Sequence, residues 1–274
     1  MAEGVRPWLW PRWDLTMIAR AALLACGLAA FSGEAMGAEI ACWLDGGVLV
    51  APATAAGVSG DFIIDTGADH SAIHNTRAQA AGVEGDSLAG EVRLAGARVA
   101  GRDLAVEDLD ARTWAFPTPI AGVIGADILK GFVVELDTSP CRLTLATAGA
   151  LPRASGASLP IRWRDDVPVV TGALSDGPRA RTVALIPATG LDAAARLSPT
   201  IASVPGADAK LLTPYEGGRA ELRALSLGGA LFEHLRVGLS DEEATSDGAV
   251  GLEVLGRWRL RFDFPAGRLH LISP

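Results

Sequence analysis

Short apolar stretches separated by turn residues make up most of the chain. Residues 133–137 and 142–145 flank a turn, and residues 260–264 and 268–271 do the same, so each pair is typical of a β-hairpin. Few long amphipathic helical stretches appear. The content of 32 glycines and 16 prolines fits a chain with many turns and short strands. The pattern therefore predicts an all-β protein with short helices.

The two hairpins are copies of one another. Asp137 aligns with Asp263 and Leu143 with Leu269, and residues 125–129 align with 251–255 at the same spacing. An internal duplication explains this most economically. We expect a first lobe over residues 39–147, a linker over 148–160 and a second lobe over 161–274.

The N-terminal region has the pattern of an export signal. Residues 21–31 are apolar, too short a run for the roughly 20 residues that span a bilayer, and small residues up to Ala38 follow. We expect a cleaved signal peptide over residues 1–38, a periplasmic or secreted protein, and no transmembrane segment after cleavage.

Two alternatives remain open within this leader. Leu23-Leu24-Ala25-Cys26 resembles a lipoprotein attachment box, which would anchor the chain through Cys26. Translation from Met17 instead of Met1 would give an ordinary leader, since residues 1–16 are an odd start for a signal.

Composition excludes several other classes of protein. Of the 274 residues, 49% are hydrophobic and 20% charged, which excludes disorder caused by low hydrophobicity. The net charge of −8 and the lack of a basic run exclude nucleic acid as an expected partner. Signal cleavage would leave Cys42 and Cys141 as the mature cysteines, either as one disulfide or as two separate buried thiols.

One motif carries candidate chemistry. Asp65-Thr66-Gly67 follows the apolar stretch 61–64 directly, which would place a carboxylate on a tight turn at the end of a buried strand. Ala68 and Asp69 continue the turn, and about sixty residues later Val123-Ile124-Gly125 precedes the first hairpin.

Together these elements resemble the retropepsin-like and pepsin-like aspartic peptidases, especially the exported bacterial retropepsin-like group. The resemblance covers about residues 41–147 well and the second half as a diverged copy. It implies two retropepsin-like acid-protease lobes, each a barrel-like β-fold with short helices.

The resemblance also implies roles for these residues. Family members use two aspartates, one from each lobe, which share a proton over a bound water. Asp65 would be one of them, and Thr66 would join a hydrogen-bond grip between the lobes. Asp69 would be a candidate for substrate contact, and residues 90–99, with a bend at Gly96, would form the flap that covers the substrate.

The second half departs from this pattern where the partner aspartate should stand. The copy of the Asp65 turn reads Ala188-Thr189-Gly190, so the turn and the grip threonine are kept but the carboxylate is lost. Asp192 matches Asp69 rather than Asp65 and does not replace the missing acid.

Three interpretations follow. A homodimer could pair two copies of Asp65 and hydrolyse peptide bonds as an aspartic endopeptidase, with the second half as an accessory domain. The two halves could instead close on each other as an inactive pseudopeptidase that binds extended peptides in the cleft between them. The motif could also be a relic in a structural envelope protein. All peptide-binding interpretations expect a peptide or protein partner.

The two histidines four residues apart are the remaining candidates for chemistry. His70 and His74 would share one face of a helix, but a strand or loop is expected at this position and no glutamate lies between them. We therefore expect no metal site and no cofactor.

Overall fold

The computed structural model describes residues 1, 38–175, 180–198, 201, 212–215, 219–239 and 246–274. Apart from Met1 and Ala38, the predicted signal peptide, with Met17 and Cys26, lies outside the described residues. The described residues from Ala38 onward belong to one compact unit. Among the residues described, no helix is both long and apolar enough to cross a membrane.

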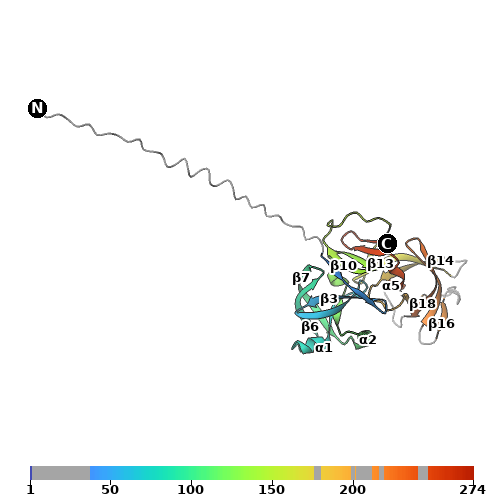
Figure 1. Cartoon of the computed structure of the whole chain (residues 1–274). Helices are drawn as coiled ribbons and strands as arrows, with labels where there is room; N and C mark the ends of the chain where they lie inside the picture. Colours follow the sequence, from blue (N-terminus) through green and yellow to red (C-terminus); the bar gives the residue numbers. More distant parts are fainter. Residues whose placement is uncertain (2–37, 176–179, 199–200, 202–211, 216–218, 240–245) are drawn as a thin grey trace. The chain divides into compact units, whose positions relative to one another are not determined.

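The first lobe contains a seven-stranded sheet with the strand order β2-β3-β4-β8-β5-β7-β6, drawn from blue to green in Figure 1. Its strands are β2 (Trp43–Asp45), β3 (Val48–Ala55), β4 (Val58–Ile64), β5 (Ala72–His74), β6 (Ser87–Leu94), β7 (Ala97–Glu107) and β8 (Ile120–Ile124). Helix α1 (Asn75–Ala80) follows β5, and helix α2 (Asp110–Thr113) lies between β7 and β8.

The centre of this sheet explains its apolar sequence. Strands β4 and β8 run parallel, with Ile63 opposite Val123 and Ile64 opposite Ile124. Every residue of β8 is buried, and Phe62, Ile63 and Ile64 are 0% exposed. Parallel strands that are covered on both faces are continuously apolar rather than alternating, as β8 and residues 62–64 of β4 are. The turn that begins at Asp65 therefore starts from a rigid, buried strand.

The second lobe contains an eight-stranded sheet with the order β12-β13-β14-β19-β15-β18-β17-β16. Its strands are β12 (Arg162–Arg164), β13 (Val167–Ser175), β14 (Ala180–Pro187), β15 (Ala195–Leu197), β16 (Leu212–Tyr215), β17 (Arg219–Leu227), β18 (Ala230–Leu239) and β19 (Gly248–Val250).

The two sheets repeat one pairing scheme. In the first lobe, β4 and β8 are parallel, β5 is antiparallel to β8, and β5 is parallel to β7. In the second lobe, β14, β19, β15 and β18 form the same three pairings. The prediction of an all-β fold with two duplicated lobes is confirmed.

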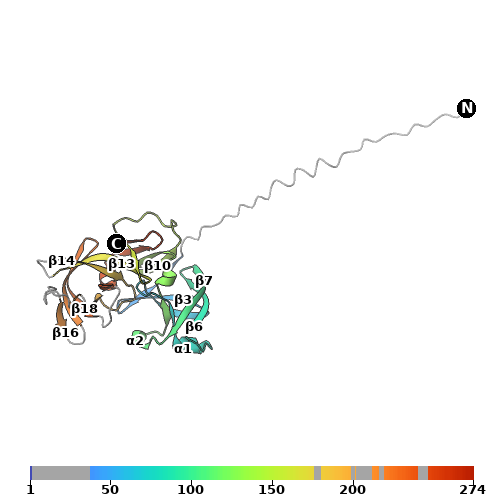
Figure 2. The ribbon, with the colours of Figure 1, turned by 180° about the vertical axis from the view of Figure 1, so that it is seen from behind.

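A third, six-stranded sheet joins the lobes in the order β1-β10-β9-β20-β21-β11. Its strands are β1 (Glu39–Ala41), β9 (Val133–Thr138), β10 (Cys141–Ala146), β11 (Ala157–Pro160), β20 (Arg259–Asp263) and β21 (Arg268–Ile272), and the short helices α3 (Ala126–Leu129) and α5 (Leu252–Leu255) precede its two hairpins. Both predicted hairpins are present, and β9 of the first lobe pairs with β20 of the second. Figure 2 shows the same elements from behind.

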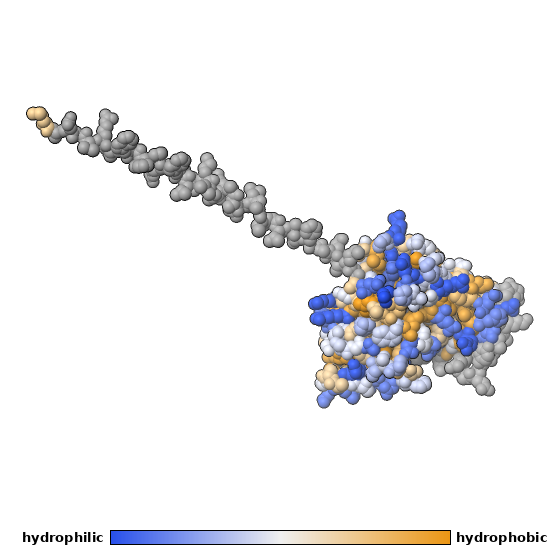
Figure 3. Space-filling view, in the orientation of Figure 1, coloured by the Kyte–Doolittle hydropathy of each residue, from blue (hydrophilic) through white to orange (hydrophobic). Residues whose placement is uncertain are grey.

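Two further contacts hold this sheet together. Arg261 on β20 forms an ion pair with Glu135 on β9, with 2.5 Å between Nη2 and Oε2. Cys42 and Cys141 form a disulfide that closes a loop of 99 residues in sequence and ties the start of the first lobe to β10. On the face shown in Figure 3, hydrophilic and hydrophobic residues are interspersed.

Two segments differ from their predicted roles. The last four residues of the expected linker, 157–160, form β11, because they pair with the edge of β21. The expected flap, residues 90–99, is fixed against the sheet instead: Thr54 and Ala55 of β3 pair with Arg93 and Val92 of β6. The flap prediction is therefore wrong for this structure, since pairing with β3 holds the hairpin away from the site described below.

Candidate functional site

Both lobes end a buried parallel strand in the same turn. The backbone N–H of Asp65 donates to the carbonyl of Ile124 at 3.0 Å, directly after β4. The N–H of Ala188 donates to the carbonyl of Val250 at 2.9 Å, directly after β14. The two turns thus leave equivalent strands in equivalent directions, as the duplication predicts.

Two threonines lock these turns together by four hydrogen bonds. Thr66 Oγ1 donates to the carbonyl of Pro187 at 2.5 Å, and Thr189 Oγ1 donates to the carbonyl of Ile64 at 2.6 Å. The N–H of Thr66 donates to Thr189 Oγ1 at 3.1 Å, and the N–H of Thr189 donates to Thr66 Oγ1 at 3.3 Å. Both threonines are 1% exposed. Each hydroxyl is donor and acceptor at once, so neither lobe can satisfy the grip alone.

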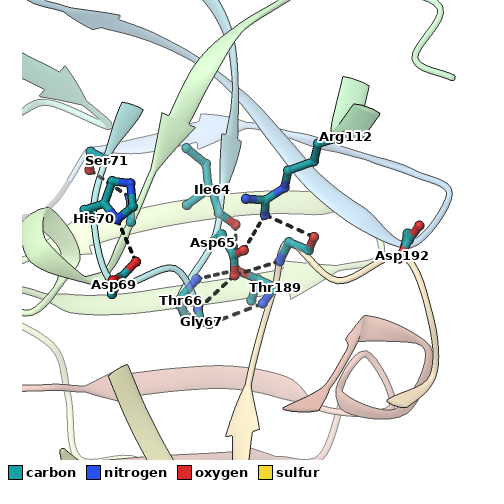
Figure 4. A network of polar contacts seen from close by, with 12 residues as sticks. Ile64, Asp65, Thr66, Gly67, Asp69, His70, Ser71, Arg112, Thr189 and Asp192 are labelled. Atoms are coloured by element: carbon teal, nitrogen blue, oxygen red, sulfur yellow. Dashed lines mark hydrogen bonds and ion pairs between the residues drawn. The ribbon is translucent and has the colours of Figure 1, made fainter. Parts of the chain in front are cut away.

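The Asp65 carboxylate is buried, and both of its oxygens accept hydrogen bonds (Figure 4). Its Oδ1 accepts the N–H of Gly67 at 2.8 Å and the N–H of Gly190 at 3.2 Å. Its Oδ2 accepts a hydrogen bond from Nη2 of Arg112, which also donates to the carbonyl of Gly190 at 3.3 Å. Among the described residues, no other carboxylate bonds to Asp65.

Ala188 stands in the second lobe where Asp65 stands in the first. A Cβ added to Gly190 would lie 2.5 Å from Cγ of Asp65, and a Cβ added to Gly67 would lie 2.6 Å from Cβ of Ala188. Each turn therefore presses its first residue against the glycine of the opposite turn, so that only glycine fits there. A methyl group occupies the position from which a second carboxylate would approach Asp65.

A cavity of about 920 Å³ opens over this centre and is lined by both lobes. Of the candidate site residues, those that line it are Asp65, Gly67, Ala68, Asp69, Ala188, Gly190 and Asp192. Thr66 and Thr189 do not line the cavity and act as buried supports. The residues that line it from the segment 107–116 are Glu107, Leu109, Ala111, Arg112, Trp114, Ala115 and Phe116.

That last segment was not found from the sequence. It connects β7 to β8 and includes α2, and it brings Arg112 onto Asp65 and leaves the Trp114 side chain 82% exposed at the cavity. The sequence signal was a charged and aromatic insertion just before the apolar strand 120–124. The spacing of apolar residues in the sequence does not show that Arg112 would contact Asp65, which lies 47 residues earlier.

Asp69 takes part in a second polar cluster at the cavity (Figure 4). His70 lies between two carboxylates, with 2.7 Å from Nδ1 to Asp69 and 2.8 Å from Nε2 to Glu107. The hydrogen bond to Glu107 is the largest cause that raises the pKa of His70 above 6.5, with Asp69 contributing in the same direction against partial burial. A protonated imidazole donates from both nitrogens and so fits this position.

The spacing of His70 and His74 does not produce a pair of ligands. His70 lies in the loop after the Asp65 turn, and His74 ends strand β5, where its Nε2 lies 3.1 Å from Asp110 of α2. Within the described part of the chain, no group of three His, Cys, Asp or Glu side chains could hold a metal ion. Asp192 pairs with Arg196 at 3.2 Å and lies apart from Asp65 in Figure 4.

Comparisons with known proteins agree with this geometry. Residues 51–131 match the family described as aspartyl protease. An aspartic proteinase from Irpex lacteus superposes with a TM-score of 0.52 at 15% identity, covering 86% of this chain and 97% of that one. Basic 7S globulin from soybean superposes with a TM-score of 0.53 at 9% identity, covering 87% of this chain and 95% of that one. No curated protein matches in sequence.

Replacing Thr189 by valine should destabilise the protein, because it leaves the buried carbonyl of Ile64 and the N–H of Thr66 without their partner. The expected loss is about 1–3 kcal/mol of unfolding free energy, measured by urea denaturation. Thr182→Val, at an exposed position of β14, is the matched control. Equal stability of the two variants would mean that the grip does not hold the lobes together.

Replacing Glu107 by glutamine should lower the pKa of His70, measured by NMR titration of the imidazole, because the hydrogen bond to Glu107 is the largest cause of its raised value. The contacts of protonated His70 with Asp69 and Glu107 stabilise the fold at pH values below the unperturbed imidazole pKa of 6.5. This stabilisation is lost as the pH rises through the raised pKa of His70 in the folded protein. An unchanged pKa of His70 in Glu107→Gln would contradict this assignment.

Proposed function

We propose that this chain, whose residues 51–131 match the aspartyl protease family and whose fold is that of an aspartic proteinase, is a pseudopeptidase that binds extended peptides without cutting them. The observation that carries this proposal is the environment of Asp65, which faces Ala188 and pairs with Arg112. The peptide would lie in the cavity between the lobes.

The chemistry of the family needs two carboxylates and one shared proton. One acid stays protonated to polarise the scissile carbonyl, and the other activates water. Here Oδ1 of Asp65 accepts two N–H groups and Oδ2 accepts Arg112, and the second lobe supplies Ala188, so no second acid is present to share a proton. We propose that Arg112 Nη2, which donates to Oδ2 of Asp65, takes the place of the water that the family's mechanism activates.

The cavity supports peptide binding independently of catalysis. Its volume of about 920 Å³ lies within the usual range for ligand sites. Its walls combine apolar side chains, such as Val48, Ile63 and Phe116, with a few charged groups at defined positions. Such a cleft suits an extended peptide, whose main chain is held by hydrogen bonds and whose side chains enter pockets.

The experiment must distinguish the proposed pseudopeptidase from a homodimeric peptidase. The grip of each first lobe is already filled by Thr189 of the same chain. Pairing two copies of Asp65 would require these four hydrogen bonds to break and the second lobe to move away. No contact of the described residues favours that rearrangement over the closed monomer.

We further propose that the chain acts in a periplasmic or extracellular compartment. The apolar run at residues 21–31 supports export, and the Cys42–Cys141 disulfide is of the kind that persists under oxidising conditions.

The test is to incubate the chain with an unfolded protein between pH 3 and 8, detect fragments by mass spectrometry, and measure peptide binding by calorimetry. We expect binding and no fragments beyond those of the Asp65→Asn variant. Ala111→Trp, which adds bulk to the cavity wall, should weaken binding about tenfold, whereas Ala80→Trp on exposed α1 should not.

Two outcomes would contradict the proposal. Fragments that disappear in Asp65→Asn would show a working aspartic peptidase, and sedimentation of the same sample would show whether the active species is a dimer. An absence of peptide binding at every pH would leave the cleft without the proposed function.

A further inference from the structure

Arg112 is the one cationic side chain at the centre of the cleft whose donors are only partly used among the described residues. A guanidinium carries five N–H donors. The two on Nη2 are directed to Asp65 and to the carbonyl of Gly190, whereas Nε and Nη1 have no hydrogen-bond partner in the described part of the chain. The side chain is 36% exposed and lines the cavity. Its remaining donors are therefore available to a ligand.

The position of these donors is fixed in advance. Asp65 and Gly190, one from each lobe, hold the same Nη2, and α2 holds the backbone of Arg112. A donor that is already immobilised loses little conformational freedom when a ligand binds. Arg112 is thus preorganised in a way that an arginine on a free loop would not be.

The charge of the cavity determines which acceptor fits. Five carboxylates line the cavity against two arginines: Asp65 pairs with Arg112 and Asp192 with Arg196. The three that remain are Asp45, Asp69 and Glu107, and the last two flank His70. An anionic ligand group would meet this excess negative charge, and the charge of Arg112 is already balanced by Asp65. A neutral oxygen is the better acceptor.

We propose that Arg112 is the positioning residue for the ligand, donating from Nε or Nη1 to one main-chain carbonyl of an extended peptide that carries neutral or basic side chains. This inference rests on the proposed function and deepens it, since it names the contact that orients the peptide and the class of peptide favoured. The arginine would hold a carbonyl at the cleft centre, where Ala188 supplies no second carboxylate to activate a water against it.

The charge preference is tested with three capped peptides that share one apolar centre and carry Ser, Lys or Glu flanks. Wild-type protein should bind the Lys peptide more tightly than the Glu peptide, and the difference should shrink as salt is raised. Arg112→Ala should weaken binding of the neutral Ser peptide about tenfold. The Lys peptide should lose less and the Glu peptide more, because the substitution leaves the charge of Asp65 unbalanced. Arg162→Ala, an exposed arginine on β12 that does not line the cavity, is the matched control.

The carbonyl contact is tested with a series of the Ser peptide in which each amide in turn becomes an alkene, which removes the carbonyl without adding charge. One member should lose about tenfold in affinity for the wild type, and it should lose no more when bound to Arg112→Ala. The peptide series is measured first on wild-type protein, so it gives a result even if Arg112→Ala folds poorly. In that case Arg112→Lys serves as the second variant. The alkene substitution that weakens binding to the wild type should then weaken binding to Arg112→Lys by a smaller factor.

Each other outcome contradicts a different statement. If the same alkene position weakens binding equally in both proteins, Arg112 does not bind the carbonyl. If Arg112→Ala affects the Glu peptide alone, Arg112 binds a carboxylate instead. If the peptides bind the wild type and no Arg112 variant changes their affinity, the inference fails while the proposed function stands. If no peptide binds the wild type, the proposed function fails.

Discussion

The paired hydroxyls of Thr66 and Thr189 are the contact on which the rest of this site depends. Each threonine donates to a strand-end carbonyl of the opposite lobe and accepts an N–H from the other threonine. Both groups are buried, so breaking the grip would leave several polar atoms unsatisfied at a cost of about 1–3 kcal/mol for each. The grip therefore fixes the separation of the two turns, and with it the cavity above them.

Between the two turns, Ala188 and the ion pair of Arg112 with Asp65 determine which groups face the cavity. Ala188 removes the second carboxylate while keeping the turn, the threonine and the glycine that packs on Asp65. A buried carboxylate without a partner is costly, and Arg112 together with two N–H groups supplies the missing stabilisation. The same arginine lines the cleft and carries further N–H donors. The proposed loss of catalysis and the proposed ligand contact would thus have one physical origin.

Local signals explain how much of this could be predicted from the sequence. The alternating apolar residues of the two hairpins, the buried run before Asp65 and the repeat that aligns Ala188 with it are short-range patterns, and they located the lobes and the two turns correctly. The partners of Asp65, the pairing of β9 with β20 and the docking of residues 92–93 on β3 join segments far apart in sequence. Side-chain periodicity carries no information about such contacts, so the role of Arg112 was missed and the flap was misplaced.

We propose that a single chain closes a catalytically inactive cleft around a peptide. A crystal structure of the mature chain, grown with an excess of a cleavable extended peptide at acidic pH, tests this proposal most directly. We expect an intact peptide between the lobes, with Arg112 still bound to Asp65 and a main-chain carbonyl on its free donors. Cleaved fragments in the cleft, or two chains joined through facing copies of Asp65 with the Thr66–Thr189 grip broken, would contradict it.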